Sequence, residues 1–330
     1  MITDHRKAAL RCTAVDRWGN SMTMASPERA TTVSAHCNAT AFVFVPNLCN
    51  AKCDFCYVQP GFTHQARASK VVLRRARAAA EALAGLGFRE VRFTGGEPTL
   101  FANLPEIIQP FLDLGLRYRV LTNAIDVDAR IPFFEHHPPE RFTISVHDTH
   151  APERFFGVPI SKSRWSRNRR KLAAIAEVEA TFVVTNPRND KRVVGRALED
   201  LAEEGVKHIK LILENSRQSE ARDFDRLAAD LKQDWSGTFD TFRFTSTSTT
   251  ACRLSEKAFP ALELGRGEVY SCCAQVGDKH LLDGHRSALP EDPESARQAV
   301  SDVITTAMSY REAALPCSEG TRFCPIALCS

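Results

Sequence analysis

The sequence has no hydrophobic run long enough to cross a membrane. No stretch of its 330 residues approaches the roughly 18 apolar residues that a membrane-spanning helix needs. The first ten residues, MITDHRKAAL, also lack the apolar segment of a secretory signal. We therefore expect a cytoplasmic protein that has no contact with a membrane.

The sequence also lacks an excess of charge and several common catalytic motifs. Its 43 basic and 40 acidic residues give a net charge of +3, which argues against a protein built to coat nucleic acid. A Walker loop, a GxSxG elbow and a Rossmann GxGxxG motif are all absent from the sequence. Hydrolase, nucleotidase and ordinary methyltransferase functions therefore have no support.

Cysteine is the residue type whose number and placement stand out. Three of the 11 cysteines form a tight run, and the 195 residues after Cys56 contain none. Disulfides are not expected in a reducing compartment, so metal or thiol chemistry is favoured. The distribution predicts two metal centres separated by a cysteine-free body. The second group comprises Cys252, Cys272, Cys273, Cys317, Cys324 and Cys329.

The cysteine-free body alternates short apolar runs with helical patterns, which predicts a parallel sheet covered on both faces. The pattern alone fits either a partial β/α barrel or an open doubly wound sheet. We expect an N-terminal extension at 1–39, the body at 40–237, and a smaller metal-dependent domain at 238–330. The expected strands are 41–46, 90–95, 118–123, 141–146, 180–185 and 206–213, and the expected helices are 70–86, 104–115, 126–136, 163–178, 191–204 and 221–234.

The first cysteine group, Cys49, Cys53 and Cys56, directly follows the first expected strand. In β/α folds the loops after the strands form the active-site face. Three thiolates at this spacing can hold one face of an iron–sulfur cube and leave one iron open. The alternative is a structural zinc with His36 or His64 as its fourth ligand.

A second motif, Gly95, Gly96 and Glu97, ends the second expected strand. Two glycines allow a ligand to approach the backbone closely, and a carboxylate can accept hydrogen bonds from an ammonium group. The alternative is an ordinary turn between a strand and a helix.

Together, the segments CNAKCDFCY and TGGEPTL resemble the signature of the radical S-adenosylmethionine enzyme superfamily, over roughly residues 40–215. The resemblance implies an α/β fold, a partial (β/α)6 TIM barrel. It also implies that Cys49, Cys53 and Cys56 ligate a 4Fe–4S cluster whose open iron binds S-adenosylmethionine. Gly95, Gly96 and Glu97 would then hold the methionyl amine, and Tyr57 would lie beside the adenine. The product of reductive cleavage, a 5′-deoxyadenosyl radical, would remove a substrate hydrogen.

Polar residues at the next two strand ends match the same superfamily loosely. Asn123 lies in Thr-Asn-Ala, where the family often has Thr-Asn-Gly. Ser145 and Asp148 are candidates for binding the ribose hydroxyls. His147 is a candidate general base, because an imidazole titrates near neutral pH. The alternative is that polar residues gather at every strand end of such folds.

The late cysteines resemble part of a SPASM domain, which carries auxiliary clusters in this superfamily. The match is Cys252-x14-Gly267-x4-Cys272, and the later cysteines are too few for two clusters. The shortened twitch version of that domain implies one auxiliary 4Fe–4S cluster, held by Cys252, Cys272 and two of the last three cysteines, Cys317, Cys324 and Cys329. A structural zinc is the alternative.

Two further features are open to more than one interpretation. Cys273 could return a hydrogen atom to a substrate radical, or it could be an inert buried thiol. A basic run at the start of the fourth long helix could bind an anionic substrate, a leader peptide or a redox donor, or it could be a solvated face. That run comprises Arg164, Arg167, Arg169, Arg170 and Lys171.

These features predict a radical S-adenosylmethionine oxidoreductase that oxidises a small-molecule alcohol of the aminocyclitol or sugar type. The auxiliary cluster would accept the second electron, and a flavodoxin or a ferredoxin-type protein would be the electron donor. The alternative enzyme modifies a ribosomal peptide by epimerisation, crosslinking or thioether formation. The alternative without catalysis is a structural zinc-binding protein.

Overall fold

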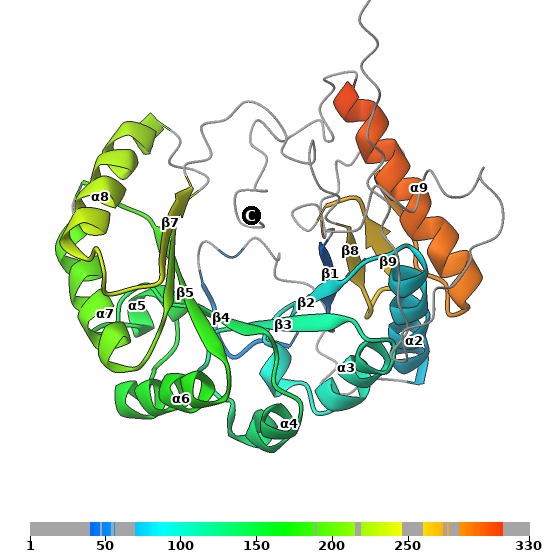
Figure 1. Cartoon of the computed structure of the whole chain (residues 1–330), viewed down its shortest axis with the longest axis horizontal. Coiled ribbons are helices and arrows are strands. Elements are labelled where there is room, and N and C mark those ends of the chain that lie inside the picture. The colour runs from blue at the N-terminus through cyan, green and yellow to red at the C-terminus, as the bar shows by residue number, and fades with distance from the viewer. Residues whose placement is uncertain are drawn as a thin grey trace, which may run out of the picture.

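The computed structural model describes residues 40–46, 48–53, 56, 70–188, 190–214, 219–245, 260–272, 276 and 284–312. Ten strands in this part of the chain form one sheet, in the order β10-β9-β8-β1-β2-β3-β4-β5-β6-β7. The sheet curves into an open ring with the helices on its outer side (Figure 1). The strands are β1 Thr40–Phe44, β2 Glu90–Thr94, β3 Arg117–Thr122, β4 Arg141–Ser145, β5 Glu177–Val184, β6 His208–Leu213, β7 Thr241–Thr245, β8 Ala261–Glu263, β9 Glu268–Tyr270 and β10 Arg286–Ala288.

Strand direction divides the sheet into two parts. Each strand from β1 to β7 is parallel to its neighbours, and β8 pairs with β1 in parallel on the other side. Strands β8, β9 and β10 are joined in antiparallel pairs. The predicted α/β fold with a parallel core, a partial TIM barrel, is confirmed.

Most of the helices connect one strand to the next along the chain. Each helix has one apolar stripe, which it buries by packing on the outer side of the ring (Figure 1). In α7, for example, Val194, Ala197, Leu198 and Leu201 are buried, at the spacing of one helical face. No helix among the described residues is long and apolar enough to cross a membrane. The helices are α2 Lys70–Gly85, α3 Leu104–Asp113, α4 Ile131–His136, α5 Glu153–Phe156, α6 Lys162–Ile175, α7 Lys191–Glu203, α8 Ala221–Asp234 and α9 Pro293–Glu312, with short 3-10 turns η2 Pro98–Leu100 and η3 Asp128–Arg130.

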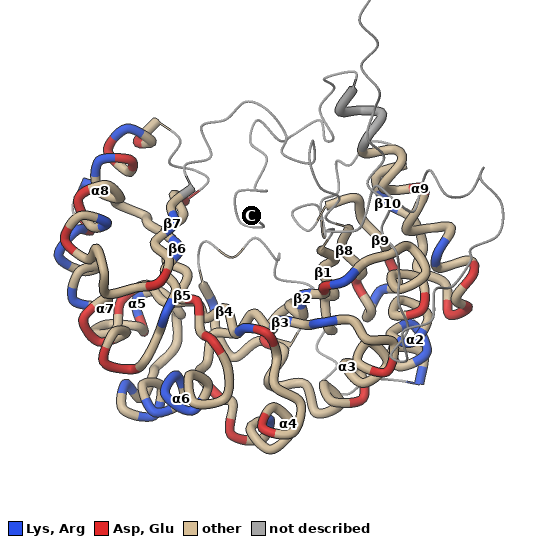
Figure 2. The backbone as a smooth tube through the Cα atoms, viewed as in Figure 1, with Lys and Arg blue, Asp and Glu red and all other residues tan. Residues whose placement is uncertain are grey.

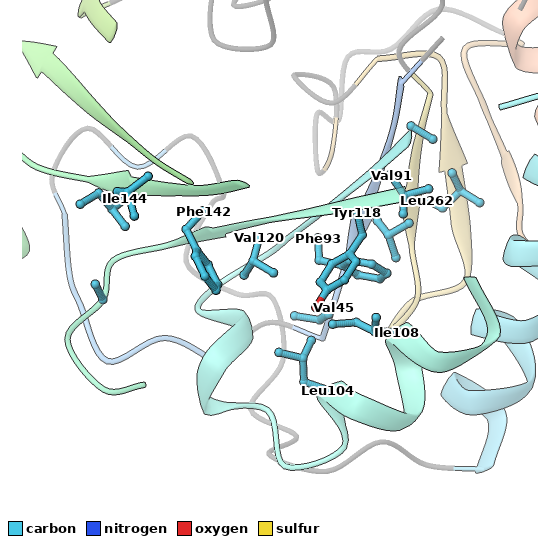
Figure 3. Packing of buried hydrophobic residues seen from close by; sticks show 14 of the residues in the cluster. Val45, Val91, Phe93, Leu104, Ile108, Tyr118, Val120, Phe142, Ile144 and Leu262 are labelled. Carbon is cyan, nitrogen blue, oxygen red and sulfur yellow. The ribbon is translucent and has the colours of Figure 1, made fainter. Parts of the chain in front are cut away.

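The core lies between the outer face of the sheet and this layer of helices. Phe93 of β2 makes an edge-to-face contact with Phe111 of α3, at 5.2 Å between ring centroids. Figure 3 shows Val120 and Phe142 of the adjacent strands on the same side, with Leu104 of α3. Successive residues of a strand point to opposite faces, so the residues between these apolar ones face the inside of the ring.

The structure differs from the sequence-based expectation after residue 237. We expected an irregular domain to begin at residue 238, but β7 extends the parallel sheet and β8 to β10 continue it at the other edge. The boundary therefore does not separate two sheets. Strands β8 to β10 have three residues each, too short to show a periodic pattern in the sequence.

The residues after β8 are attached to the first long helix. Arg75 of α2 donates from Nη1 to the carbonyl oxygens of Leu264 and Gly265, at 3.1 and 3.0 Å. Strand β9 begins directly after Gly267, and Cys272 lies two residues after its end. Helix α9 lies against α2 on the outer side (Figure 1).

Candidate active site

The candidate residues meet at one edge of the sheet because the strands that carry them are parallel. Cys49 follows β1, Glu97 follows β2, Asn123 follows β3 and Asp148 follows β4. The carboxyl ends of parallel strands lie at the same edge, which is where β/α barrels place their active sites.

Glu97 lies at this edge as a hydrogen-bond acceptor for several groups, and it is 1% exposed. Its Oε1 accepts hydrogen bonds from the Thr99 backbone N–H (3.1 Å), the Thr99 hydroxyl (2.7 Å) and the Thr122 hydroxyl (2.6 Å). Its Oε2 accepts one from the Asn123 N–H at 2.7 Å. Its own backbone N–H donates to the Leu48 carbonyl at 2.7 Å. Glu97 thus connects the ends of β2 and β3 to the segment that carries Cys49.

This bonding bears on the predicted role of Glu97. Burial raises the pKa of the Glu97 carboxyl, and its hydrogen bonds from Asn123, Thr122 and Thr99 oppose that rise. Oε1 accepts three of these hydrogen bonds and Oε2 accepts one, so among the described donors Oε2 keeps capacity for a ligand's ammonium group, and that role of Glu97 stays a prediction. The four described hydrogen bonds show that the carboxylate holds the ends of β2 and β3 together, which the sequence motif alone did not show.

Gly95 allows β1 and β2 to end in close contact. Its φ angle is +136°, and a Cβ atom there would lie 2.6 Å from the Val45 carbonyl oxygen. The Val45 N–H donates to the Thr94 carbonyl oxygen at 2.9 Å, so the two strand ends are hydrogen-bonded where the glycine begins. No residue with a side chain fits this position without moving the backbone.

The cysteine segment rests on the end of α5. The Lys52 N–H donates to the Phe156 carbonyl oxygen at 2.7 Å. Gly157, which ends α5 with a φ of +63°, lies so close that a Cβ atom would be 2.5 Å from the Lys52 carbonyl oxygen. Further along, the Cys56 N–H donates to the Cys53 carbonyl oxygen at 3.1 Å.

The donor chemistry of this segment fits a soft metal or an iron–sulfur cluster. As whole residues, Cys49 and Cys56 are exposed and Cys53 is half-buried. Burial is the largest cause that raises the pKa of Cys49, and the charges of Glu97 and Cys56 add to it, while the Ala51 N–H opposes it. A bound cation removes this penalty by deprotonating the thiols. Within the described residues, no three His, Cys, Asp or Glu side chains are grouped as a site for a single metal ion.

Asn123 connects the Glu97 side of the site to the cysteine side. Its Nδ2 donates to the Asn50 side-chain oxygen at 2.8 Å and lies 4.0 Å from the Cys49 sulfur. The next residue, Ala124, is buried and has a φ of +56°, which accounts for the glycine that the family often has there. Asn168 of α6 donates to the Ala124 carbonyl oxygen at 3.0 Å and stabilises this conformation.

A buried ion pair lies behind Asn123 and corrects one expectation. Trp165 donates from Nε1 to the Asn123 carbonyl oxygen at 2.9 Å, and the Arg169 guanidinium lies 4.0 Å from the Trp165 ring centroid. Arg169 is buried and binds Glu204 through two hydrogen bonds of 2.5 and 2.6 Å. Arg169 is therefore not part of a solvated or ligand-binding basic face. Its buried partner is 35 residues away in the sequence, so no local pattern could reveal the pairing.

Two other members of the basic run have acidic neighbours. Arg164 pairs with Asp126 at 2.9 Å and Lys171 with Asp128 at 2.6 Å, all half-exposed. These exposed pairs contribute little to stability. They compensate part of the positive charge that was expected to attract a ligand.

His147 has surroundings that suit a neutral packed ring. Burial lowers its pKa to about 3, although the Val183 N–H hydrogen bond opposes this shift. That N–H donates to His147 Nδ1 at 3.2 Å, and the ring stacks on Phe155 with centroids 5.3 Å apart. An imidazole with so low a pKa is a weak base, and the role of His147 as a general base stays a prediction.

The predicted ribose-binding residues lie at the end of β4. Asp148 is buried, and its Oδ1 accepts hydrogen bonds from the His150 and Ala151 N–H groups at 2.8 and 3.1 Å. Ser145 is half-buried and faces the inside of the ring. The role of both in binding a ribose stays a prediction.

The second cysteine group is described at one residue only. Cys272 is buried directly after β9, and the neighbouring Ser271 hydroxyl lies 2.8 Å from His285 Nδ1. The remaining predicted residues lie outside the described part of the chain, so their roles stay predictions. They are Tyr57, Cys252, Cys273, Cys317, Cys324 and Cys329.

The contact between Gly157 and Lys52 can be tested with a matched pair of variants. We expect Gly157→Ala to lower the free energy of unfolding by about 3 kcal/mol, because backbone strain and a clash with Lys52 combine. Gly115→Ala is the control, since Gly115 also has a positive φ (+73°) but nothing within 4 Å of the added Cβ. It should cost about 1 kcal/mol. Urea denaturation of both variants measures the difference, and equal losses would contradict this account of the loop.

Comparison with known proteins identifies similar sequences and folds. Residues 43–186 match the family model described as the Radical SAM superfamily. GTP 3′,8-cyclase 1 of Mycobacterium tuberculosis is 29% identical over 138 residues, which are 40% of this chain and 37% of the relative. GTP 3′,8-cyclase of Corynebacterium glutamicum is 33% identical over 143 residues, 40% of this chain and 36% of the relative. The chain thus spans little more than a third of these curated relatives.

Two solved structures show the same fold at low sequence identity. Streptococcus suis SuiB bound to precursor peptide SuiA has a TM-score of 0.61 and 12% identity, over 76% of this chain and 63% of that chain. Native anSMEcpe with bound AdoMet has a TM-score of 0.59 and 14% identity, over 88% of both chains. At these identities the similarity concerns the fold alone.

Proposed function

Residues 43–186 form a radical S-adenosylmethionine domain, and from that premise we propose that the chain generates a substrate radical at the edge where β1 to β4 end. The observation that carries the proposal is the hydrogen-bonded connection of three segments there. Glu97 binds the ends of β2 and β3, and Asn123 reaches from β3 to the cysteine segment after β1.

Each group of residues has a task in this proposal. Cys49, Cys53 and Cys56 hold a 4Fe–4S cluster, and Gly95, Gly96 and Glu97 receive the methionyl amine of S-adenosylmethionine. When bound, the cluster supplies the electron that cleaves S-adenosylmethionine to a 5′-deoxyadenosyl radical, which takes a hydrogen atom from the substrate. Glu97 and Asn123 act as positioning residues, because they fix the cysteine segment relative to the glycine turn.

We further propose oxidation of a small-molecule alcohol, of the aminocyclitol or sugar type, with a second cluster as the acceptor of the second electron. Cys252, Cys272 and two of Cys317, Cys324 and Cys329 would hold that cluster. Support comes from Cys272, which lies two residues after β9, a strand that is two positions from β1 in the sheet. A flavodoxin or ferredoxin-type protein would deliver the first electron.

The test is an anaerobic assay of the full chain. We expect brown protein with about eight irons per chain and formation of 5′-deoxyadenosine on addition of a reductant. Alcohol oxidation would lower the substrate mass by two hydrogens, whereas epimerisation would leave the mass unchanged. Colourless protein with stoichiometric zinc, or iron-loaded protein that forms no 5′-deoxyadenosine, would contradict the proposal.

The two cysteine groups should differ in their effect on the assay. We expect Cys272→Ala to stop product formation while leaving some cleavage of S-adenosylmethionine that is uncoupled from product. The matched variant Cys53→Ala should lose cleavage itself. If circular dichroism shows both variants folded and both lack cleavage entirely, the separate roles of the two centres are wrong.

A further inference from the structure

The inner face of the ring carries many charged side chains, which the mechanism proposed above does not use. Figure 2 shows Lys and Arg on the strands as well as on the outer helices. Strand register places these residues on the inner face, alternating with the apolar residues of the core. On the described strands from β2 to β7, six cations share this face with three carboxylates. The cations are Arg92, Arg117, Arg119, Arg141, Lys210 and Arg243, and the carboxylates are Glu90, Glu177 and Glu179.

One row of this inner face begins at the candidate active site. Ser145, the last residue of β4, is in register with Thr181 of β5. Thr181 is in register with Lys210 of β6, and Lys210 with Arg243 of β7. Neighbouring strands lie about 5 Å apart, so Lys210 lies about 10 Å across the sheet from the residue expected to face the ribose. The row therefore extends from the proposed radical site along the inner face.

Among the described residues, Glu179 is the carboxylate that lies beside the cations of this row. Glu179 is 7% exposed and is shared between two arginines: it pairs with Arg243 and lies 3.7 Å from Arg141. Lys210 is 4% exposed, and its pKa is lowered to about 8 by burial first, then by Arg243 and Arg92, with Glu179 opposing. Two cations on adjacent strands, one of them buried, attract a ligand's anionic group more strongly than exposed cations do.

Polar atoms near the row can also bind a ligand. The Thr181 hydroxyl oxygen is buried, and no residue in the described part of the chain hydrogen-bonds to it. Arg243 is 45% exposed, so its planar guanidinium is accessible beside the buried Lys210. An ammonium, a guanidinium and a hydroxyl on adjacent strands together suit a carboxylate or a phosphate group.

We propose that an anionic group of the substrate, a carboxylate or a phosphate, binds to Lys210, Arg243 and Thr181 on the inner face of the sheet. That the bound molecule is a substrate rests on the proposed radical function, whereas binding of the anion does not. Of the two substrate types proposed above, these cations favour a sugar that carries an acidic group, because they would repel the ammonium groups of an aminocyclitol. This arrangement predicts the class of substrate. The molecule carries a negatively charged group at Lys210 and Arg243, and its reacting carbon lies at the end of β4.

The test compares two lysines on the same segment. Lys210→Met removes the buried cation, and Lys207→Met removes an exposed one three residues earlier, with the same change in net charge. Calorimetric titration of the anaerobically purified full chain uses malonate and inorganic pyrophosphate at constant ionic strength, with and without S-adenosylmethionine. We expect at least tenfold weaker binding in Lys210→Met, about 1.4 kcal/mol, and less than a twofold change in Lys207→Met.

A second variant covers the case in which Lys210→Met fails to fold. Arg243→Gln changes a half-exposed side chain on an edge strand, and it too should weaken binding by about tenfold. Binding of pyrophosphate alone supports a phosphate group, binding of malonate alone a carboxylate, and binding of both an anion of either kind. The proposal is overturned if neither probe binds the wild-type chain, or if binding is the same in Arg243→Gln and Lys207→Met.

The anion site and the radical function can fail separately. The titrations contain no reductant, so they do not depend on cleavage of S-adenosylmethionine. Wild-type protein that binds a probe but never forms 5′-deoxyadenosine would contradict the radical function and leave the anion site intact. Protein that forms 5′-deoxyadenosine but binds neither probe would contradict the anion site alone.

Discussion

Replacing Cys49, Cys53 or Cys56 with Ala is expected to reduce cleavage of S-adenosylmethionine to the background of the assay. A 4Fe–4S cluster with an open iron needs all three thiolates, and no fourth cysteine lies nearby in the sequence to substitute. The fold should survive the change, because Cys49 and Cys56 are exposed residues. Exposed substitutions usually alter the free energy of unfolding by less than about 0.5 kcal/mol.

The matched control is Cys12→Ala, which removes a thiol that lies outside both predicted centres. It should retain cleavage and iron content, whereas each of the three variants should lose about four irons per chain. Measurements are the iron content, the 5′-deoxyadenosine formed and the urea midpoint of the metal-free chain. Cleavage by the triple alanine variant would show that the cysteine segment does not carry the chemistry.

Changing Glu97 should have the largest effect on stability. We expect Glu97→Gln to lower the free energy of unfolding by about 2–4 kcal/mol. An amide in place of the carboxylate points an NH2 group at either the Asn123 N–H or the donors of Thr99 and Thr122. Two donors then face each other in a buried site, and at least one hydrogen bond is lost. Cleavage of S-adenosylmethionine should fall as well, because the cysteine segment loses its fixed position.

The control for this change is Glu81→Gln, at an exposed position of α2. It removes the same charge and should change the free energy of unfolding by less than about 0.5 kcal/mol. Urea denaturation of the metal-free chain separates the two variants. Equal stability of Glu97→Gln and the wild type would mean that the hydrogen bonds to Glu97 contribute no net stability.

Glu97 should also contribute to the dependence of stability on pH. Burial raises the pKa of its carboxyl above the unfolded value, so the folded chain binds more protons in that interval. The contribution of Glu97 to stability therefore falls as the pH rises from the unfolded pKa through the folded pKa. The Glu97→Gln variant should lack this component when the two pH profiles are compared.

Much of the fold could be predicted because its signals are local. The six predicted strands and the helices between them follow from short apolar runs that alternate with a helical spacing, and each depends on neighbours a few residues away. The segment 221–234 is a helix with the same bounds in the structure. The cysteine spacing and the Gly-Gly-Glu turn are equally local, since eight residues and three residues suffice to recognise them.

Some charged residues were misjudged because burial depends on distant partners. Arg169 lies among four other basic residues, which favoured a solvated face, yet Glu204 and Trp165 enclose it. Lys210 lies in the run VKHIKLIL, where the apolar neighbours dominate the pattern. Its position in a row of cations on the inner face follows only from the register of β5, β6 and β7.

The sequence by itself determined the alternation of strands and helices and the soft-metal donor set of the first cysteine group, since both depend on residues that are close together along the chain. Tertiary structure alone decided that Glu97 is a hydrogen-bonded link between strands, that β7 and β8 extend the sheet, and that Lys210 and Arg243 lie side by side on the inner face. The physical reason is that strand pairing brings together residues 25 to 64 positions apart, and hydrogen bonds or ion pairs form between them only after that pairing.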